Sequence, residues 1–346
     1  MVLDPFWDTE RLFPRLGNQQ SSTSIRRGHR FDSALAINLA PAGRSVVLTR
    51  GRQFAIIHLV AAGRRMARAA ACRGNRISLR ISILASGSSG NSTLLETGCT
   101  TLLVDAGYGR KELGRRFEAL GRARPEHVDA ILVTHEHTDH CNGLAQLARD
   151  WDCAAYLTEP THREIRKMFA DTPAKQPARV EHVRPGLKFE IGDIEVTPFS
   201  IPHDAADPVG YVLRCNGTKV GIVTDLGYLP ELVKQHLRDA DFLILESNHD
   251  LEMLKMGPYP WFIKQRVMSR TGHLSNAVVS EFLADSEVFD ARPRHLVLAH
   301  VSEQNNNPDV ARISAEEALG RRSSNFAFRG SLHVASQRVP LGPFEL

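Results

Sequence analysis

The chain has 346 residues, of which 42% are hydrophobic, and a net charge of +4. This length accommodates one large domain or two ordinary ones with a buried core, which excludes a wholly disordered chain. The longest apolar stretch near the N-terminus, residues 54–62, contains His58 and is too short to cross a bilayer, so we expect no membrane partner. The five cysteines have no CxxC spacing, which favours free thiols in a reducing cytoplasm over a disulfide framework.

Charge is distributed unevenly along the chain. Residues 1–78 contain 13 arginines, no lysine and 4 acidic residues, a net charge of +9, whereas residues 79–346 have a net charge of −5. Residues 1–76 also show no sustained hydrophobic period. They are either a basic, disordered arm that helps bind an anionic partner or the product of a start assigned too far upstream, since Met66 is the next methionine. Residues 77–346 are expected to form the folded domain.

Short β-branched segments and amphipathic segments alternate from residue 77 onward. Strands are predicted at residues 77–84, 93–96, 101–105, 130–134, 154–157, 194–200, 210–214, 219–224, 242–246, 295–299 and 332–336. Helices are predicted at residues 111–120, 143–150, 161–169, 230–237, 260–269, 276–289 and 310–319. Because helices are interleaved with many strands, several of them joined as hairpins, we expect sheets that pack together and are flanked by helices.

A run of ligand-type side chains follows the predicted strand that ends at residue 134. Within six positions it contains His135, His137, Asp139 and His140. The first two histidines are two positions apart and can point to the same side of an extended chain. Asp139 and His140 follow as the chain turns into a helix that starts near residue 142. One segment can therefore serve two metal ions, and its imidazole and carboxylate ligands suit zinc, manganese or iron.

Three further ligand-type residues follow other predicted strands. His203, Asp225 and His300 come after the strands that end at residues 200, 224 and 299. Each strand would deliver its residue to the same edge, where loops held by a rigid scaffold commonly carry function. A single histidine at a strand end is more often structural. Together with the first run, however, these residues complete the ligand count of a dinuclear site.

These residues resemble the motifs of the metallo-β-lactamase superfamily from about residue 79 to the C-terminus. The resemblance implies an α+β fold, a four-layer αββα sandwich, and two divalent metal ions, with zinc expected and manganese or iron as alternatives. It implies that Asp105, in the motif LLVDAG, orients ligands from an outer position. The ligands it implies are His135, His137 and His203 for one ion and Asp139, His140 and His300 for the other, with Asp225 bridging both.

The resemblance also implies a hydrolytic mechanism for the domain at residues 77–346. Two cations a few ångströms apart share a water and lower its pKa toward neutrality, so a bridging hydroxide would be the nucleophile, with Asp139 among the catalytic residues. Asp225 stands where some zinc β-lactamases have a cysteine. This difference favours the hydrolases and phosphodiesterases of the superfamily over antibiotic resistance.

Two residues resemble the additional acid motif of ribonuclease Z-type phosphodiesterases. His273 lies in GHLSN just before the predicted helix at 276–289, and Glu246 ends the predicted strand at 242–246. A histidine paired with a carboxylate can stay protonated near neutral pH and give its proton to a leaving alkoxide, so both are candidate catalytic residues. The alternative is that His273 only precedes the helix, with Ser275 or Asn276 as its cap.

Two segments resemble the WalJ/YycJ group of bacterial metallo-β-lactamase proteins, namely the Gly- and Ser-rich residues 84–92 and the sequence AHVSEQNN at 299–306. Members of that group are regarded as 5′-to-3′ exonucleases on double-stranded DNA or related phosphodiesterases. A phosphodiester substrate, with DNA as one candidate, is therefore implied. The backbone amides of the first segment could bind an anion, but a tight hairpin connection needs the same residues.

The segment ahead of His273 has a composition that suits nucleic-acid binding. Aromatic rings could stack bases and the cations could bind phosphates. An amphipathic helix with a solvated basic face is the alternative. The net charge of −5 on residues 79–346 counts against binding of a polyanion and thus against a nuclease. The interval from Asp225 to His300 also leaves no room for the inserted domain of large nucleases. The segment contains Tyr259, Trp261, Phe262, Lys264, Arg266 and Arg270.

Two other functions use the same fold. A glyoxalase-type thioesterase or lactonase would use the same metal ions on a carbonyl, but it is expected to carry a helical substrate domain at the C-terminus. A non-catalytic, metal-binding regulatory protein is expected to lack ligands, and none is missing from this sequence. The expected function is therefore a dinuclear-metal-dependent phosphodiesterase or nuclease, with DNA, RNA and small phosphodiesters as open substrates and the oligomeric state open.

Overall fold

The computed structural model describes residues 35–37, 46–48 and 79–346. Within the N-terminal segment, β1 (Leu35–Ile37) and β2 (Val46–Leu48) form an antiparallel pair. The two interpretations of residues 1–76, a disordered arm or an upstream start, otherwise lie outside the described residues. No helix in the described part of the chain is long and apolar enough to cross a membrane.

The first sheet of the main domain has the strand order β16-β3-β4-β5-β6-β7-β8. Pairing is antiparallel from β16 to β5 and parallel from β5 to β8. At the start of this sheet Leu79 and Leu346 exchange two backbone hydrogen bonds of 3.3 and 2.9 Å. The strands are β3 (Arg80–Ala85), β4 (Ser92–Glu96), β5 (Thr101–Val104), β6 (Ala130–Leu132), β7 (Ala154–Thr158), β8 (Val180–Val183) and β16 (Leu341–Glu345).

The second sheet has the order β15-β14-β13-β12-β11-β10-β9. Pairing is antiparallel from β9 to β12 and parallel from β12 to β15, so each sheet has one antiparallel half and one parallel half. The strands are β9 (Phe189–Ile191), β10 (Ile194–Ser200), β11 (Val209–Cys215), β12 (Thr218–Val223), β13 (Phe242–Glu246), β14 (His295–Ala299) and β15 (Ser331–Val334).

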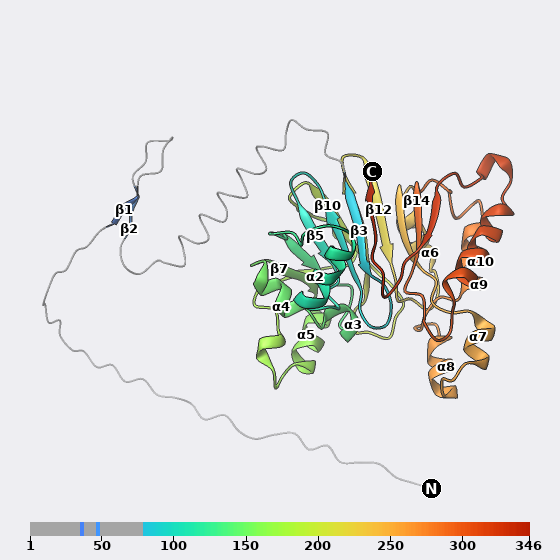
Figure 1. The fold of residues 1–346 in the computed structure, drawn as a ribbon, viewed down its shortest axis with the longest axis horizontal. Helices are drawn as coiled ribbons and strands as arrows, with labels where there is room; N and C mark the ends of the chain where they lie inside the picture. Colours follow the sequence, from blue (N-terminus) through green and yellow to red (C-terminus); the bar gives the residue numbers. More distant parts are fainter. Residues whose placement is uncertain (1–34, 38–45, 49–78) are drawn as a thin grey trace, which may run out of the picture. The chain divides into compact units, whose positions relative to one another are not determined.

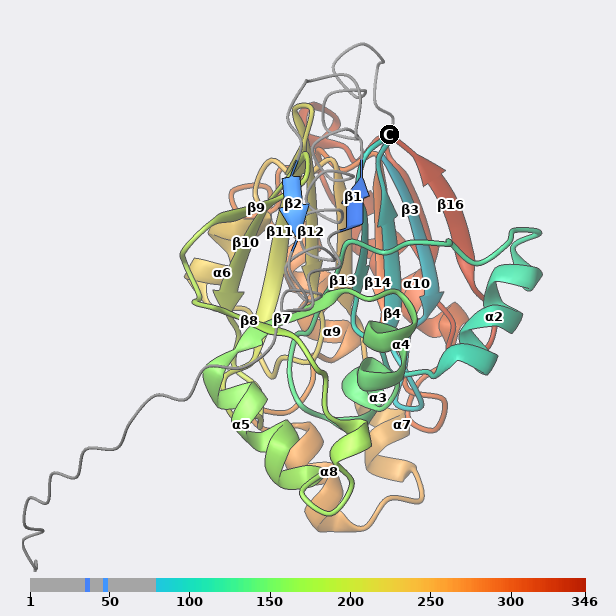
Figure 2. The same cartoon turned by 90° about the vertical axis from the view of Figure 1, so that its left-hand side faces the viewer.

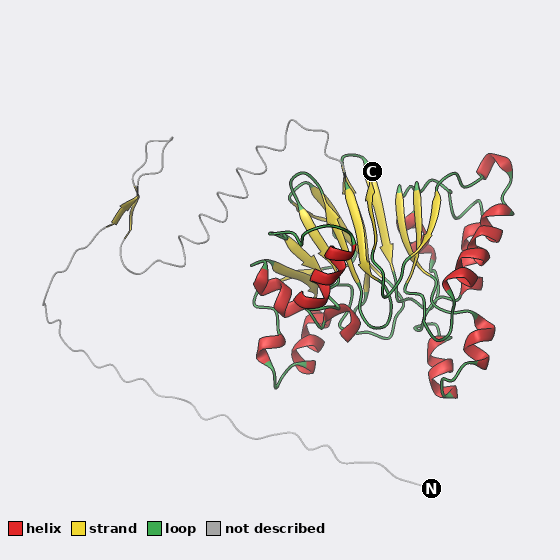
Figure 3. Cartoon of the chain, viewed as in Figure 1, coloured by secondary structure: helices red, strands yellow, loops and turns green. Residues whose placement is uncertain are grey.

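Helices cover the outer faces of the two sheets, as Figures 1 and 3 show for the main domain. Those on the first sheet are α2 (Arg110–Ala119), α4 (Leu144–Asp150) and α5 (Glu159–Met168), and those on the second are α6 (Glu231–Leu237), α9 (Asn276–Ala284) and α10 (Pro308–Gly320). Three short helices, α3 (Thr138–Cys141), α7 (Leu251–Met256) and α8 (Trp261–Val267), lie beyond one edge of the sheets.

Three apolar clusters separate four layers and confirm the predicted αββα sandwich. One cluster lies between the sheets, and the others lie between each sheet and its helices. Strand β13 contributes to two of these clusters because successive side chains of a strand point to opposite faces. Phe242 and Ile244 face the other sheet, while Leu243 and Leu245 face the helices. Because both faces of a central strand are buried, the sequence of such a strand is a continuous run of apolar residues.

Each predicted strand and helix has a counterpart in the structure, but β1, β2, β8, β9, β16, α3 and α7 were not predicted. Several of these have only three to six residues, too few for a period to appear. Strand β16 contains Gly342 and Pro343, which disfavour strands. The predicted helix at 276–289 ends at Ala284, because Asp285 takes an extended conformation and its side chain accepts a hydrogen bond from the amide of Glu287.

The cysteines only partly match the expectation of free thiols. Cys141, Cys153 and Cys215 are free and buried in the described domain, where burial raises each thiol pKa to about 12. Cys99 is disulfide-bonded, so the expectation is wrong for this residue.

Candidate metal centre

The predicted ligands meet at the sheet edge where α3 lies, and Figure 2 shows α3, α7 and α8 at that edge. His135 and His137 follow β6, and Asp139 and His140 lie within α3, so the chain enters helix earlier than the predicted residue 142. The other elements that end there supply one residue each: β10 precedes His203, β12 precedes Asp225, and β14 precedes His300.

The first donor set consists of His135, His137 and His203. Nε2 of His135 lies 3.0 Å from Nδ1 of His137, and Nε2 of His203 lies 3.3 Å from the same Nδ1 atom. The three ring nitrogens all lie within 4.8 Å of one another. Three imidazole nitrogens that converge in this way offer three lone pairs to one point.

The second donor set consists of Asp139, His140 and His300. Oδ2 of Asp139 lies 3.4 Å from Nε2 of His140 and 3.5 Å from Nε2 of His300. Asp225 lies between the two sets: its Oδ2 is 3.3 Å from Nε2 of His140, and it also forms a close group with His135 and His140. The structure thus brings together all seven residues that the sequence proposed as ligands, in the two predicted groups.

Outer contacts turn the histidine rings toward the centre. Nδ1 of His140 lies 2.8 Å from Oδ2 of Asp105, and Nδ1 of His203 lies 3.2 Å from the carbonyl oxygen of Thr271. Each contact engages Nδ1 and leaves Nε2 facing inward, which is how partners behind metal-binding histidines usually act. Asp105 therefore lies where the sequence analysis expected it.

Thr134 contacts site residues, a role that the sequence analysis missed. Its hydroxyl lies 3.0 Å from both oxygens of Asp105 and 3.0 Å from Nδ1 of His135. The hydroxyl thereby connects the outer carboxylate to the first donor set. Because threonine is common in strands, its position at the end of a predicted strand gave no signal of this role.

Three of the strand-end residues have left-handed backbone conformations. The φ angles are 61° at Asp105, 62° at Asp225 and 52° at His300. A non-glycine residue in this region costs about 1–2 kcal/mol, and such strain concentrates at functional sites. Each strand therefore turns sharply where it ends, and the turn directs the side chain into the centre.

Buried carboxylates dominate the electrostatics of the site. Although burial opposes it, the carboxylates of Asp105 and Asp225 raise the pKa of His140 well above its usual range. Burial likewise opposes ionisation of Asp225, but the charges of His300 and His140 hold its pKa well below the usual range. His135, in contrast, has a pKa well below normal, because burial and the His140 charge both disfavour its protonation.

These residues fit a pair of divalent cations. Oδ2 of Asp225 and Nε2 of His300 are buried and form no hydrogen bond to any described residue. Buried polar atoms without hydrogen bonds are rare in proteins, and here each lies 3.3 or 3.5 Å from another nitrogen or oxygen atom of a donor set that suits zinc. Nε2 of His135 and Nδ1 of His137, which lie 3.0 Å apart, could also coordinate the same cation. The donor chemistry therefore agrees with the metal ions that the family implies.

Asn91 is a second residue that the sequence analysis missed. Its Nδ2 lies 2.9 Å from Nε2 of His140 and donates to Oδ2 of Asp139 at 3.3 Å and to the carbonyl of Gly87 at 3.1 Å. The amide of Gly87 in turn donates to Oδ1 of Asn91. The Gly- and Ser-rich segment is therefore a β3–β4 hairpin connection, as one of the two readings expected, and it places an amide beside the second donor set.

The other predicted catalytic pair lies at the rim of the same centre. Nδ1 of His273 is 2.7 Å from Oε1 of fully buried Glu246. The alternative for His273 also holds in part, because Ser275 caps α9 through the amide of Val278. The two readings are compatible, since the capping contact does not involve the imidazole ring.

A pocket of about 190 Å³ opens over the centre. It is lined by Ser88, His137, Asp139, His203, Asp204, Asp225, Ile263, Arg266, Val267, Gly272, His273 and His300. Ligands from both donor sets therefore share one opening with the imidazole of His273.

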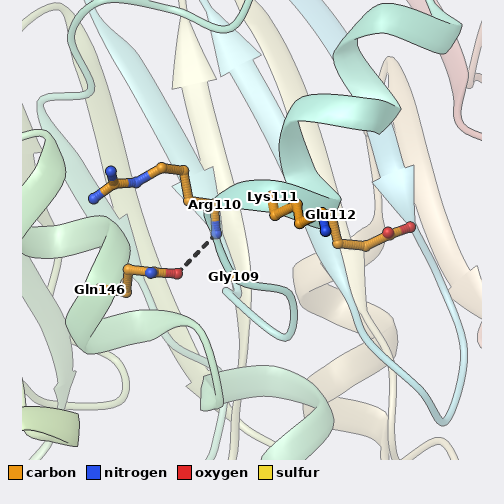
Figure 4. Close-up of a pocket in the computed structure, with 5 residues that line it drawn as sticks. All are labelled: Gly109, Arg110, Lys111, Glu112 and Gln146. Atoms are coloured by element: carbon orange, nitrogen blue, oxygen red, sulfur yellow. Dashed lines mark hydrogen bonds between the residues drawn. The ribbon is translucent and has the colours of Figure 1, made fainter.

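A separate surface hollow lies at the N-terminal end of α2. Figure 4 shows its lining residues Gly109, Arg110, Lys111, Glu112 and Gln146, with the amide of Arg110 donating to Oε1 of Gln146 at 2.9 Å. It shares no lining residue with the pocket over the donor sets. The converging donors place the chemistry in that pocket rather than in this hollow.

Comparisons with known proteins agree with this geometry. The model of the beta-lactamase superfamily domain matches residues 100–301. Exodeoxyribonuclease YycJ of Bacillus anthracis is 37% identical over 262 residues, which are 76% of this chain and 97% of the relative. Ribonuclease Z of Methanopyrus kandleri is 31% identical over 180 residues, which are 49% of this chain and 58% of that protein.

The solved structures show the same fold. The metallo-beta-lactamase fold protein YhfI from Bacillus subtilis superimposes with a TM-score of 0.56 at 17% sequence identity, covering 78% of this chain and 100% of that chain. The family model covers more than half of this chain, and YycJ is matched over nearly its whole length. The chain therefore belongs to the β-lactamase superfamily, in the group that includes YycJ.

Proposed function

We propose that this chain is a metal-dependent phosphodiesterase that hydrolyses DNA from a 5′ end. The observation that supports this most is the position of the Glu246–His273 pair, which shares one pocket with both donor sets. Similarity to the exodeoxyribonuclease YycJ supports DNA as the substrate. Similarity to ribonuclease Z supports phosphodiester chemistry more generally.

The residues divide into those that hold metal ions and those that act on substrate. His135, His137 and His203 would hold one divalent cation, and Asp139, His140 and His300 the other, with Asp225 between them. When bound, such a pair of cations lowers the pKa of a shared water and stabilises negative charge on the attacked phosphorus. Asp105 and Thr134 keep the rings of His140 and His135 in place. We propose zinc, because three converging imidazoles suit it best.

His273 is the proposed proton donor to the leaving oxygen. Its Nδ1 is engaged by Glu246 at 2.7 Å, so Nε2 is the atom that can reach a substrate in the pocket. A carboxylate in this position fixes the ring orientation and favours the protonated imidazole. A positioned proton donor contributes about 10²–10⁴-fold to the rate of such reactions.

The C-terminal residues disfavour the thioesterase or lactonase alternative. After α10 the chain adds β15 to the second sheet and β16 to the first, instead of forming a helical substrate domain. The regulatory alternative expects missing ligands, but all seven proposed ligands lie together. Between Asp225 and His300 the chain forms α6, β13, α7, α8, α9 and β14, so a nuclease of this kind would be compact.

A comparison of three substrates tests the proposal. Hydrolysis of bis(p-nitrophenyl) phosphate, of 5′-phosphorylated duplex DNA and of a thioester is measured for the wild type, for Asp139→Ala and for Asp171→Ala. Asp171 is an exposed aspartate and serves as the matched control. We expect cleavage of both phosphodiesters, its loss in Asp139→Ala, and wild-type rates in Asp171→Ala. Thioester cleavage without phosphodiester cleavage would contradict the proposal.

A further inference from the structure

Two adjacent aromatic side chains are exposed close to the proposed metal centre. Trp261 and Phe262, the first two residues of α8, are 62% and 67% exposed, and Met256 at the end of α7 is 85% exposed. Aromatic rings gain much free energy on burial, and a cluster of exposed apolar side chains commonly marks a binding surface. We call Trp261 and Phe262 the α8 aromatic pair.

The helix that carries this pair also forms a wall of the pocket. Ile263, Arg266 and Val267, later in α8, line the pocket beside His273. The backbone amide of His273 donates to the carbonyl of Val267 at 2.9 Å. A molecule bound on the α8 aromatic pair therefore lies on the same rigid element that fixes the proposed proton donor.

Buried polar contacts hold α8 in this position. Lys264 is 8% exposed, and its ammonium group donates to the carbonyl of Lys255 in α7 at 2.6 Å. Helix α7 is capped by Asp250, whose amide donates to the carbonyl of Asn305. Lys264 therefore does not belong to a solvated basic face, which was the alternative reading of this segment. A surface that is already rigid binds its partner with less loss of entropy.

Two arginines, Arg266 and Arg270, follow the α8 aromatic pair in the sequence. Arg266 is the one Lys or Arg among the described residues that line the pocket, and its guanidinium pairs with Asp204 at the rim. Arg270 lies over the ring of Tyr228, 4.1 Å from its centre. A phosphate that enters the pocket therefore meets a guanidinium beside the donor sets, and guanidinium groups bind phosphate well.

Charge alone does not explain how the domain would bind a polyanion, because residues 79–346 have a net charge of −5. Stacking of bases on aromatic rings does not depend on net charge and tolerates any sequence. Exposed aromatic rings next to a pocket with a single cation thus fit unpaired nucleobases better than they fit a paired duplex surface.

We propose that the α8 aromatic pair stacks the unpaired bases at a DNA end, while Arg266 binds a phosphate that enters the pocket. This inference rests on the proposed function, since it assigns the substrate contacts of that same site. Stacking on α8 would separate the terminal bases and place the scissile phosphate between the donor sets and His273. Each stacked base commonly contributes about 5- to 150-fold to affinity.

The test compares Trp261→Ala/Phe262→Ala with Phe326→Ala, in which a remote aromatic side chain that is 52% exposed is removed. Substrates are 5′-phosphorylated DNA with unpaired terminal bases, the same DNA with abasic sites at those positions, and bis(p-nitrophenyl) phosphate. We expect the double variant to raise KM for the unpaired DNA at least tenfold and to lower the ratio of kcat/KM for DNA to that for the small diester. Phe326→Ala should match the wild type.

Abasic sites should weaken binding by the wild type but have little further effect on the double variant. Equilibrium binding of the same DNAs by fluorescence anisotropy, without added metal, measures the contact separately from catalysis. Wild-type affinity in the double variant, or equal losses on normal and abasic DNA, would overturn the inference and point to another partner for this surface. A wild type that binds unpaired DNA through the pair but cleaves no phosphodiester would instead contradict the proposed function alone.

Discussion

Glu246 places one carboxylate oxygen, Oε1, 2.7 Å from Nδ1 of His273 and 3.1 Å from Nδ1 of His300. Its other oxygen accepts hydrogen bonds from the amides of Leu226 and Leu274. Although burial raises its pKa, the charge of His273 lowers it to about 2, so the group is a carboxylate at neutral pH. One fully buried side chain therefore orients both a proposed metal ligand and the proposed proton donor.

Glu246→Gln should impair both functions together. The amide has the same shape but only one acceptor oxygen. If that oxygen accepts from the two backbone amides, the NH2 group faces the histidine rings, so both rings lose their acceptor. We expect turnover to fall about 10–100-fold and metal content to fall below that of the wild type. Metal analysis of the purified variant and kcat for bis(p-nitrophenyl) phosphate measure the two effects. Full metal content would show that Glu246 does not position His300.

His273→Ala should separate the two functions. Because His273 is proposed to donate a proton and not to bind metal, metal content should equal that of the wild type while kcat falls about 10²–10⁴-fold. His182→Ala, which removes an exposed histidine on β8, is the matched control and should change neither quantity. If His273→Ala loses a metal ion, the residue is a ligand and the assignment is wrong.

Asp105→Asn should weaken the second donor set. Asparagine tolerates the left-handed backbone that Asp105 adopts, so the change removes charge and one acceptor without adding strain. His140 then loses the carboxylate 2.8 Å from its Nδ1. We expect metal affinity to fall about 10–100-fold, as measured by competition with a chelator. Unchanged affinity would show that Thr134, whose hydroxyl lies 3.1 Å from Nδ1 of His140, is sufficient to orient that ring.

Stability should decrease in acid because of His249. This side chain is 2% exposed, and burial lowers its pKa to about 4. An unfolded histidine titrates near 6.5, so between these values the unfolded chain binds the proton and the folded protein does not. The folded state therefore loses about 3 kcal/mol from this residue as pH falls from 7 to 4, at about 1.4 kcal/mol per pKa unit.

The measurement for His249 is the free energy of unfolding in urea at pH 7, 5.5 and 4. His249→Gln should show a smaller decrease than the wild type over this range, whereas His182→Gln should follow the wild type. Parallel curves for His249→Gln and the wild type would contradict the prediction.

The sequence indicated several of the proposed strand-end site residues because they follow continuous apolar runs. Leu243 and Leu245 face one cluster and Phe242 and Ile244 another, so the run that delivers Glu246 is recognisable without tertiary information. The same holds for Asp225 and His300. Side-chain spacing predicted that His135 and His137 face one ion and that Asp139 and His140 face the other. In the structure the two pairs fall into separate candidate donor groups, and His135 and His140 also lie together beside Asp225.

Contacts between segments far apart in sequence were not predictable. Asn91 contacts His140 from a hairpin whose composition indicated a turn or an anion site, but no contact with a proposed ligand. Strand β16 pairs with β3, which lies more than 250 residues earlier, and its own sequence contains Gly342 and Pro343. The pairing of Arg266 with Asp204 likewise depends on how α8 packs against the loop after β10. These features arise from tertiary packing and leave no local period.

The hydrogen bonds between Leu79 and Leu346 bring the two ends of the folded domain together. They lie at the start of β3, whereas the other end of that strand reaches Ser86, whose hydroxyl accepts a hydrogen bond from the amide of His300. The domain is therefore suited to circular permutation, since a short linker would join its ends. An affinity tag or surface attachment at Leu346 would likewise leave the pocket open to a long polymer.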